Sequence, residues 1–539
     1  MRAILYISLL VALSSAQVIK DKELDWWEDT VFYQIYPRSY ADNNGDGIGD
    51  LNGITSKLEY IKETGIGAIW LSPIFQSPMY DFGYDISDFY DIHDEYGTME
   101  DFEKLVAESK KLGIKVILDL VPNHSSNESM WFQEALKSNT SKYYNYFVWE
   151  DGKIDAEGNR QPPNNWLSHF HDSAWEYKEE VGKYYLHQFV VGQPDLNYRN
   201  PDVIEEMKVI LNQFWLDKGV AGFRVDAVNC LYEVNKELFN GVYPDEPRSG
   251  AVGVEPNDHA YLDHIYTKDQ DETPYVVYDW RDLLDEYKEK DGMTRVMMTE
   301  VYATIQNVVK YFGEGDRVGA QMPFNFDLIT LVNSKSSAPD IKYAVDKFLT
   351  YKPLDKMANW VVGNHDNSRM ATRFGPNLVD GINMIVHLLP GVGVTYMGEE
   401  IGMVDGYVSW EDTIDPAGCN SQDPVNYYKW SRDPERTPFQ WNSENNAGFS
   451  SGNKTWLPVA EGYETLNVEV QKAAEKSHYK VYQALLKLRH EMVWYRGRVY
   501  VVVINLKDSE HTVDLSNLEN VYGHGIVEIS SINSPRSIR

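Results

Sequence analysis

Cysteine and basic residues are both scarce in this chain of 539 residues. Its only cysteines are Cys230 and Cys419, so one disulfide can form and a disulfide framework is excluded. It has 50 lysine and arginine residues against 82 aspartate and glutamate residues, which gives a net charge of −32. Because such a chain repels phosphate backbones, the composition argues against nucleic acid as a partner.

Long apolar runs are also lacking, apart from one at the N-terminus. Arg2 precedes the apolar segment Ala3–Leu13, and Ser14, Ser15 and Ala16 supply the small residues of a cleavage site. This pattern is typical of a secretory signal peptide and is too short to span a bilayer. We therefore predict a signal peptide at 1–16, a secreted mature protein with no membrane span, and N-glycosylation at Asn127, Asn139 and Asn453.

Eight short apolar segments, each typical of a strand, alternate with helical patterns along most of the chain. Helix starts are marked by Thr98 with Asp101 three residues later, and by Asn200 followed by Pro201. Repeated β-then-α units predict a parallel (β/α)8 barrel. A doubly wound open sheet is the alternative, which the lack of an early glycine fingerprint disfavours. The segments are Val31–Tyr36, Ala68–Leu71, Ile114–Val121, Gly222–Ala227, Val296–Thr299, Gly319–Met322, Trp360–Val362 and Val392–Tyr396.

The alternation breaks once, after the third predicted strand. Residues 125–192 are polar and rich in Asn, Tyr and Trp, which predicts an inserted domain overhanging one end of the barrel. The barrel would then comprise residues 17–124 and 193–492. The remaining residues, 493–539, read as a short antiparallel β domain with strands at Val499–Ile504, Thr512–Leu515 and Ile526–Ile529.

Polar clusters stand at the ends of four predicted strands. Asn123 and His124 follow the third strand, and Arg224 and Asp226 close the fourth. Glu300 closes the fifth strand, and Asn364, His365 and Asp366 follow the seventh. Each cluster alone reads as a cap, a turn or a buried polar group. In a barrel, however, the carboxyl ends of the strands meet at one mouth, so the four together predict a functional site.

Two carboxylates flanked by histidine and arginine suit the cleavage of an acetal. One carboxylate attacks the sugar carbon as an anion, while the other delivers a proton to the leaving group. Arg224 lies on the same strand face as Asp226 and favours its ionised form. Met297, Met298 and Val301 give Glu300 apolar neighbours, which favour a neutral acid.

These motifs resemble those of the α-amylase family of glycoside hydrolases, on its α-glucosidase and oligo-1,6-glucosidase branch. The chain is most similar to the secreted insect maltases of that branch. The resemblance extends over roughly residues 27–490. Its matching stretches are Asp119–His124, Gln193–Asn197, Gly222–Ala227, Met298–Glu300, Val362–Asp366 and Arg436–Trp441.

The resemblance implies a barrel with an inserted domain B and a C-terminal domain C, which is shorter here than is usual in the branch. It implies Asp226 as the nucleophile, Glu300 as the acid/base and Asp366 as a third carboxylate that binds and distorts the ring. The side chains expected to hold the non-reducing glucose are Asp85, His124, Arg224, His365 and Arg436.

The implied activity is that of a retaining, exo-acting α-glucosidase. It would release glucose from maltose and short malto-oligosaccharides, and sucrose is a further candidate substrate. Ala227, directly after the nucleophile, favours α-1,4 bonds by analogy with related enzymes. Three alternatives stay open: a transglycosylase, a catalytically silent sugar-binding or receptor protein, and an ancillary heavy chain of an amino-acid transporter. Heavy chains carry an N-terminal membrane helix, which this sequence lacks.

A second candidate site lies after the first predicted strand. Oxygens of Asp42, Asn44, Asp46 and Asp50 alternate with glycines, and the carbonyl of Ile48 supplies a further ligand. This arrangement resembles a calcium loop, although no glutamate occupies the twelfth position of an EF-hand. An Asx-rich turn is the alternative. We expect a structural calcium ion and no organic cofactor.

Overall fold

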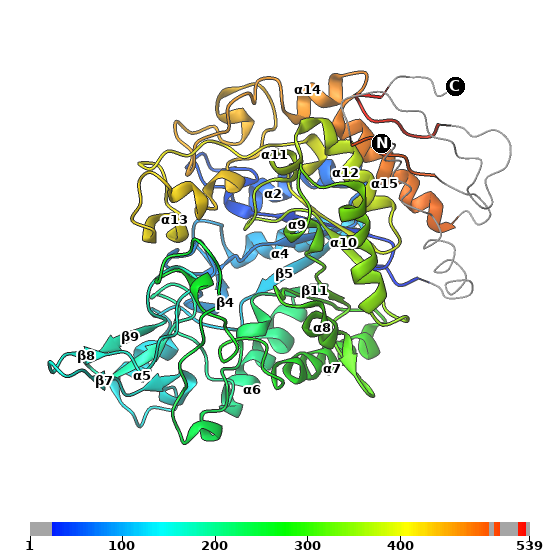
Figure 1. Ribbon diagram of the computed structural model, residues 1–539. Helices are drawn as coiled ribbons and strands as arrows, with labels where there is room; N and C mark the ends of the chain where they lie inside the picture. The colour runs from blue at the N-terminus through cyan, green and yellow to red at the C-terminus, as the bar shows by residue number, and fades with distance from the viewer. Residues whose placement is uncertain (1–23, 495–500, 507–526, 535–539) are drawn as a thin grey trace.

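The centre of the molecule is a barrel of parallel strands. The computed structural model describes residues 24–494, 501–506 and 527–534. Eight strands form one sheet in the order β15-β12-β11-β5-β2-β1-β17-β16, which confirms the predicted (β/α)8 barrel. Figure 1 shows these strands at the centre, surrounded by helices. Their bounds are β1 (Val31–Ile35), β2 (Ala68–Leu71), β5 (Lys115–Leu120), β11 (Gly222–Val225), β12 (Val296–Thr299), β15 (Met322–Pro323), β16 (Asn359–Val361) and β17 (Val392–Tyr396).

The helices begin and end largely where the sequence signals stand. Thr98 and Asp101 form the predicted capping box of α4, and Gly113 ends that helix in the left-handed conformation. Pro201 occupies the first turn of α6, whose last residues pass into a π-helical segment, Ile210–Leu216. The main helices are α2 (Leu51–Ser56), α3 (Leu58–Thr64), α4 (Met99–Leu112), α6 (Pro201–Val209), α7 (Thr273–Asp291), α8 (Ile305–Val308), α9 (Asp327–Thr330), α10 (Ala338–Tyr351), α11 (Met370–Phe374), α12 (Val379–Leu388), α13 (Pro416–Asn420), α14 (Val468–Ala473) and α15 (His478–Trp494).

Alternating side chains of the strands divide the core into two layers. Phe223 and Val225 of β11 face outward, where they pack with side chains of the surrounding helices. The barrel interior holds a separate cluster, which includes Phe32, Trp70 and Met298. Arg224, between the two outward residues, therefore points inward. The period-2 pattern thus determines which side chains of each strand reach the mouth of the barrel.

One seam of the barrel is held by side chains. Within the described residues, β15 pairs only with β12, and β16 pairs only with β17. The Asn359 amide bridges the gap: it donates to Pro323 O (2.7 Å) and accepts from Asn325 N (2.8 Å). The predicted strand Gly319–Met322 is correspondingly displaced, because Gly319 and Ala320 donate to Phe312 O and Tyr311 O instead. Only Met322 and Pro323 remain for β15.

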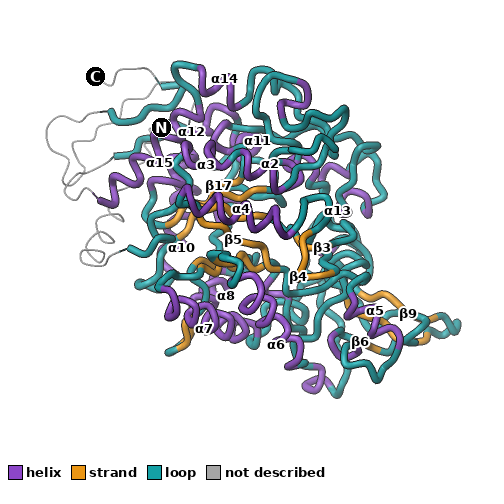
Figure 2. Tube along the Cα trace, turned by 180° about the vertical axis from the view of Figure 1, so that it is seen from behind, coloured by secondary structure: helices purple, strands orange, loops and turns teal. Residues whose placement is uncertain are grey.

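The segment between β5 and α6 projects away from the barrel (Figures 1 and 2). It contains α5 (Met130–Lys137) and a three-stranded sheet in the order β6-β10-β9. The bounds are β6 (Trp149–Glu150), β9 (Trp175–Lys178) and β10 (Lys183–Leu186), with a small hairpin of β7 (Lys153–Ile154) and β8 (Arg160–Gln161). Two further strand pairs flank the barrel: β3 (Phe75–Gln76) with β4 (Asp88–Ile92), and β13 (Gly313–Glu314) with β14 (Arg317–Val318).

The C-terminal residues differ from the sequence prediction. The predicted strand Thr512–Leu515 lies outside the described residues, as does the predicted signal peptide at 1–16. Residues 501–504 and 527–529 are described and form no strand. They meet the rest of the protein through side chains instead: Val502, Ile504 and Ile529 pack against buried residues of α12 and α15. A strand needs a backbone partner, and these side-chain contacts do not provide one.

Two further predictions concern cysteine and the membrane. Cys230 is buried and Cys419 is exposed, and both are free thiols. Among the helices that the structure describes, none combines the length and apolarity that a bilayer crossing requires.

Candidate active site

Arg224 is the centre of the polar cluster at the mouth of the barrel. One of its terminal nitrogens bonds Asp119 (2.8 Å) and Asp226 (2.6 Å). The other terminal nitrogen lies 2.8 Å from Glu300 Oε2. Strand register explains the meeting: Arg224 of β11 stands beside Asp119 of β5 and Met298 of β12. Asp226 and Glu300 each follow two residues further on, so both reach the same guanidinium.

The turn after Asp226 fixes the second carboxylate. Ala227 adopts the left-handed conformation, with φ 42° and ψ 35°. That conformation costs a non-glycine residue roughly 1 kcal/mol, and it points the Ala227 N–H at Glu300 Oε2, 2.8 Å away. Gly222, at the start of β11, allows the close approach to β12, because a Cβ there would lie 2.1 Å from Val296 O. The local sequence therefore places both carboxylates beside the guanidinium of Arg224.

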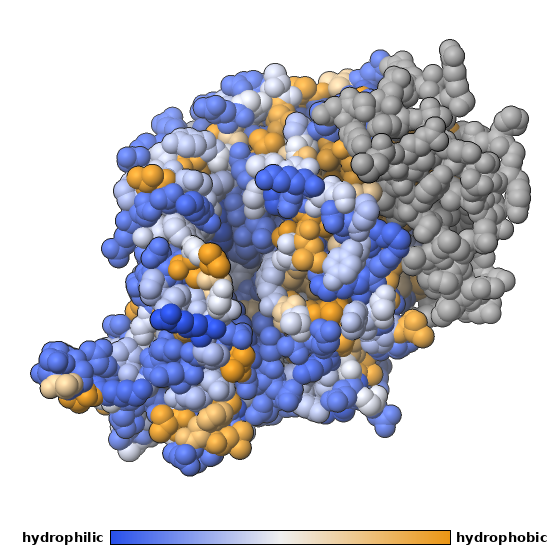
Figure 3. Space-filling model, in the orientation of Figure 1, coloured by the Kyte–Doolittle hydropathy of each residue, from blue (hydrophilic) through white to orange (hydrophobic). Residues whose placement is uncertain are grey.

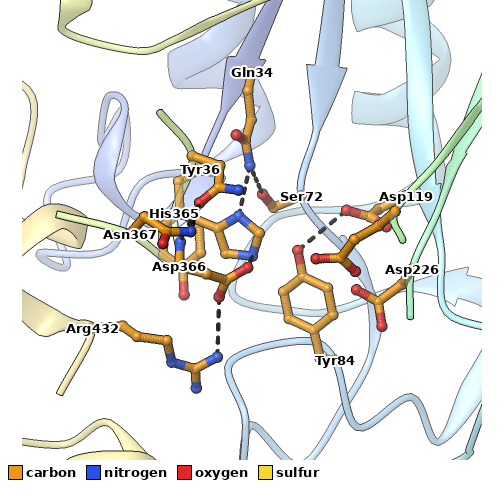
Figure 4. A network of polar contacts seen from close by, with 12 residues as sticks. Gln34, Tyr36, Ser72, Tyr84, Asp119, Asp226, His365, Asp366, Asn367 and Arg432 are labelled. Atoms are coloured by element: carbon orange, nitrogen blue, oxygen red, sulfur yellow. Dashed lines mark hydrogen bonds and ion pairs between the residues drawn. The ribbon is translucent and has the colours of Figure 1, made fainter. Parts of the chain in front are cut away.

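Asp366 approaches from the opposite side of the mouth (Figure 4). Its Oδ1 receives Arg432 (3.1 Å) and Arg436 (2.9 Å). Its Oδ2 lies 3.3 Å from Nε2 of His365. The Gln34 amide lies 2.7 Å from the other ring nitrogen of His365, which favours the tautomer that donates to Asp366. Tyr84 stacks on His365 (5.3 Å between ring centroids), so the ring is held on one face as well.

The three carboxylates differ in their electrostatic environment. Burial alone would raise the pKa of Asp366, but His365 and the two arginines hold it below its usual range. Burial raises the pKa of Asp226 well above its usual range, and Glu300 and Asp119 add to that rise. Arg224, which bonds Asp226 at 2.6 Å, opposes the rise and favours the ionised carboxylate, in the direction that the sequence predicts.

Asp119, which bonds the same arginine, also has a shifted pKa. Burial raises its pKa to about 7, although Arg224 lowers it. Its Oδ2 also accepts from Trp70 and Tyr84, each at 3.2 Å. Because the buried carboxylates around Arg224 repel one another, this cluster favours holding a proton. A reaction that needs one carboxylic acid and one carboxylate uses that arrangement directly.

The other predicted substrate ligands are distributed unevenly. His124 is buried, with Nε2 3.0 Å from Tyr84 O and 3.1 Å from the Gln193 amide nitrogen. Burial lowers its pKa to about 3, so it is a neutral group. Asp85 does not meet the other site residues: its oxygens accept from the Ser77 hydroxyl and from two backbone N–H groups of the same loop.

Two residues that the sequence analysis did not select complete the site. Asp81, four residues before Asp85, pairs with Arg432 at 2.8 Å. Arg432 also pairs with buried Asp415 at 2.6 Å, so this arginine joins three acidic side chains, including Asp366. A sequence signal was available, because Arg432 stands four residues before Arg436, just ahead of the matching stretch Arg436–Trp441. Figure 3 shows that this face of the molecule is hollowed, with mostly hydrophilic residues around the hollow.

The Asp42–Asp50 loop presents the hard oxygen donors that calcium prefers. Gly45 and Gly47 have φ values of 83° and 96°, which allow the tight turn. The acidic side chains are engaged by the loop itself: Asp42 accepts from the N–H groups of Gly45 and Gly47, and Asp50 from those of Asn43 and Gly53. Among the described residues, no group of three or more His, Cys, Asp or Glu side chains could hold a metal ion. In this conformation the loop does not fit a calcium ion closely.

A parallel barrel that brings carboxyl groups together at one mouth fits a glycoside hydrolase, which uses a pair of them. Residues 34–496 match the model of the alpha-amylase catalytic domain, and the chain belongs to the alpha-amylase family. Its curated relatives include "Maltase A1" of Drosophila melanogaster, 49% identical over 95% of this chain and 92% of the relative. "Salivary alpha-glucosidase" of Anopheles gambiae is 51% identical over 91% and 83%.

Solved structures agree with this assignment. The alpha-glucosyl transfer enzyme XgtA superposes with a TM-score of 0.79 and 35% sequence identity, over 87% of this chain and 85% of XgtA. The resemblance inferred from the sequence motifs is therefore confirmed, and with it the fold class and the assignment to a family of enzymes.

Proposed function

We propose that this protein is a retaining α-glucosidase that releases glucose from maltose and short malto-oligosaccharides. The observation that carries the proposal is that Arg224 bonds both Asp226 and Glu300, with Asp366 close by. Bonding to one guanidinium keeps the two acids close, which favours the carboxylate spacing of double displacement over the wider spacing that inversion requires. The names of the maltase and α-glucosidase relatives support the substrate class.

The reaction follows in two displacements. Asp226 attacks the anomeric carbon of glucose while Glu300 gives its proton to the departing glycosidic oxygen, which leaves a covalent glucosyl-Asp226. Glu300, now ionised, takes a proton from water, whose oxygen attacks the same carbon and frees Asp226. Asp366, His365, His124, Arg224, Arg436 and Asp85 are the proposed glucose ligands. Two inversions retain the α-configuration.

We further propose that cleavage is exo-acting. The Asp81–Arg432 pair ties the loop between β3 and β4 to the segment after α13, and Arg432 also pairs with Asp366. An ion pair beside the glucose site supports a pocket that is closed at the non-reducing end. Ala227 favours α-1,4 bonds, with sucrose as a second substrate. Hydrolysis rates on maltose, isomaltose, sucrose and trehalose test this order, and faster cleavage of isomaltose than of maltose would contradict it.

Transglycosylation is the second candidate activity. It uses the same glucosyl-Asp226, with a sugar hydroxyl in place of water as the attacking group. The structural likeness to XgtA, an alpha-glucosyl transfer enzyme, favours keeping this candidate. A silent sugar-binding protein is the non-enzymatic alternative. An assay of the purified protein with an aryl α-glucoside, followed by product analysis at high maltose concentration, distinguishes the three.

Secretion, glycosylation and the domain division remain our proposals. The salivary α-glucosidase relative supports secretion. Asn139 and Asn453 are exposed and suit glycosylation, whereas Asn127 is half-buried. We assign 125–192 to domain B, 17–124 and 193–492 to the barrel, and 493–539 to domain C. Mass spectrometry of peptides from the secreted protein tests the signal cleavage and each sequon.

Calcium binding at Asp42, Asn44, Asp46, Ile48 and Asp50 is likewise a proposal. Its support is the donor chemistry, together with the glycines that let the loop wrap. The backbone N–H groups that now occupy the carboxylates would have to turn away when the ion binds. Metal analysis of protein purified without chelator tests the proposal, and metal-free protein would contradict it.

A further inference from the structure

A tyrosine hydroxyl joins the two strand ends that carry Glu300 and Asp366. Tyr302 follows Glu300 by two residues, after β12, and Asn364 follows β16. The Tyr302 hydroxyl accepts hydrogen bonds from the side-chain amides of Asn364 (2.9 Å) and Asn367 (3.1 Å). The two asparagines have no role in the glucose site described above, yet they stand on either side of Asp366 in the sequence.

The turn that carries Asp366 is closed by its own side chains. Asn364 Oδ1 accepts from Asp366 N (3.0 Å) and from the Asn367 amide (2.8 Å). The two asparagines also form an isolated backbone bridge, and Figure 4 shows Asn367 beside Asp366. Because the turn is tied together in this way, a shift of either asparagine would move Asp366 with it.

The hydroxyl bridges the edge of the barrel where backbone pairing is missing. Within the described residues, β15 and β16 share no backbone pairing. Tyr302 stacks on Phe326, which follows β15, with ring centroids 4.2 Å apart and planes 9° apart. We call Tyr302, Phe326, Asn364 and Asn367 the clasp, since together they connect the ends of β12, β15 and β16.

The other contacts of the two carboxyl groups come from different parts of the chain. Arg432 and Arg436, which follow α13, pair with Asp366. Arg224 of β11 pairs with Glu300. Among the described ion pairs, none of these three arginines bonds both carboxyl groups. The clasp therefore supplies a direct link between the strand ends on which the two groups stand.

We propose that Tyr302 is a positioning residue, whose hydroxyl sets the place of Asp366 relative to Glu300 by holding the turn. The proposal rests on the α-glucosidase function proposed above. A carboxylate that binds and distorts the glucose ring must stand at a fixed place relative to the acid/base, because a small misplacement costs much of the rate. Tyr302 acts on the rate through Asp366, without itself taking or giving a proton.

The test compares Tyr302→Phe with the wild-type protein. The substitution keeps the stack on Phe326 and any ring contact with the substrate, so it removes the hydroxyl alone. Tyr302 is exposed, so the change opens no core cavity and the variant should fold. We expect kcat on maltose to fall about 5–50-fold while KM changes about twofold or less, because ring distortion acts in the transition state.

Tyr275→Phe is the matched control. Tyr275 is also exposed, and its hydroxyl bonds Glu314 (2.7 Å) outside this site. The control should leave kcat and KM on maltose unchanged. A lower melting temperature with an unchanged kcat in Tyr302→Phe would show a purely structural role and would overturn the proposal.

A second comparison shows whether the effect passes through Asp366. In an Asp366→Asn background, Tyr302→Phe should lower kcat on an aryl α-glucoside by about twofold or less, because the carboxylate that it positions is already gone. The full loss seen in the wild-type background would contradict this. Asn364→Ala takes the place of Asp366→Asn if that variant is too slow to measure, and the same outcome is expected.

Asn364→Ala also covers the case in which Tyr302→Phe does not fold, because it removes one partner of the hydroxyl. It should then show the same fall in kcat with little change in KM, and an unchanged kcat would overturn the proposal. A wild-type protein inactive on both maltose and the aryl α-glucoside would instead contradict the α-glucosidase function itself.

Discussion

Glu300→Gln separates acid/base chemistry from folding. Glu300 Oε2 receives two hydrogen bonds, from Ala227 N and from Arg224, each at 2.8 Å. A carboxamide can place its oxygen at the same position and keep both bonds, and Arg224 retains Asp119 and Asp226. We therefore expect the free energy of unfolding to change by about 2 kcal/mol or less.

The expected loss of activity is much larger. The second carboxyl oxygen carries the proton for the leaving group, and a carboxamide cannot deliver one. Proton transfer by a positioned acid contributes about 10²- to 10⁴-fold, so kcat on maltose should fall by that factor, or roughly 3–5 kcal/mol in activation free energy. A dinitrophenyl α-glucoside, whose leaving group needs no proton, should lose far less in the first displacement.

The assay is intact-protein mass spectrometry after mixing with the dinitrophenyl substrate. In Glu300→Gln the second displacement lacks its base, so a protein carrying one glucosyl unit should accumulate, and peptide mapping should place it on Asp226. Asp226→Ala should accumulate none. Maltose activity above a tenth of wild type in Glu300→Gln, or an adduct in Asp226→Ala, would refute the reasoning.

Three further predictions concern stability, pH and metal. Arg432→Ala leaves the buried Asp81 and Asp415 without their cationic partner, so it should lower the free energy of unfolding by about 3 kcal/mol. A double-mutant cycle with Asp81→Asn, followed by thermal unfolding, tests the pairing. Additive losses in the two single variants would contradict it. Burial raises the pKa of Glu399 to about 8, so the folded protein favours the protonated carboxyl group. The stability that this protonation gives is lost as pH rises from about 4.5 toward 8. Glu399→Gln should therefore gain stability over wild type at pH 8 relative to pH 5, and equal melting shifts at both values would exclude this. Chelation should lower the melting temperature of calcium-loaded wild-type protein and should not change that of the Asp42→Ala, Asp46→Ala double variant. An equal change in melting temperature in the two proteins would exclude the loop as the calcium site.

The barrel and the catalytic cluster could both be predicted, because they depend on local signals. Strands of alternating pattern predicted which side chains point inward, and parallel strands bring their carboxyl ends to one mouth. Arg224, Asp226 and Glu300 followed from that alone. The capping box at Thr98 and the proline at 201 are similarly local, and the structure has both.

Features that depend on long-range partners could not be predicted. Asp85 and Asp81 both stand in one loop, and only the tertiary pairing with Arg432 distinguishes them. The pKa of Asp226 depends on how many carboxylates share one burial site, which strand pattern does not report. The shift of the sixth strand arose because residues 319 and 320 donate to a preceding turn.

The Asn359 amide between β15 and β16 has a consequence for how the barrel comes apart. At this edge the described strands are joined by side chains, those of Asn359 and Arg373, in place of the backbone pairing found between the other strands. Pro323 has no backbone N–H, so it cannot donate a replacement hydrogen bond across this edge if the bond from the Asn359 amide breaks. Heat or denaturant would unroll the eight strands from this edge. Asp366 follows β16 and Glu300 follows β12, so unrolling would part the third carboxylate from the other two early.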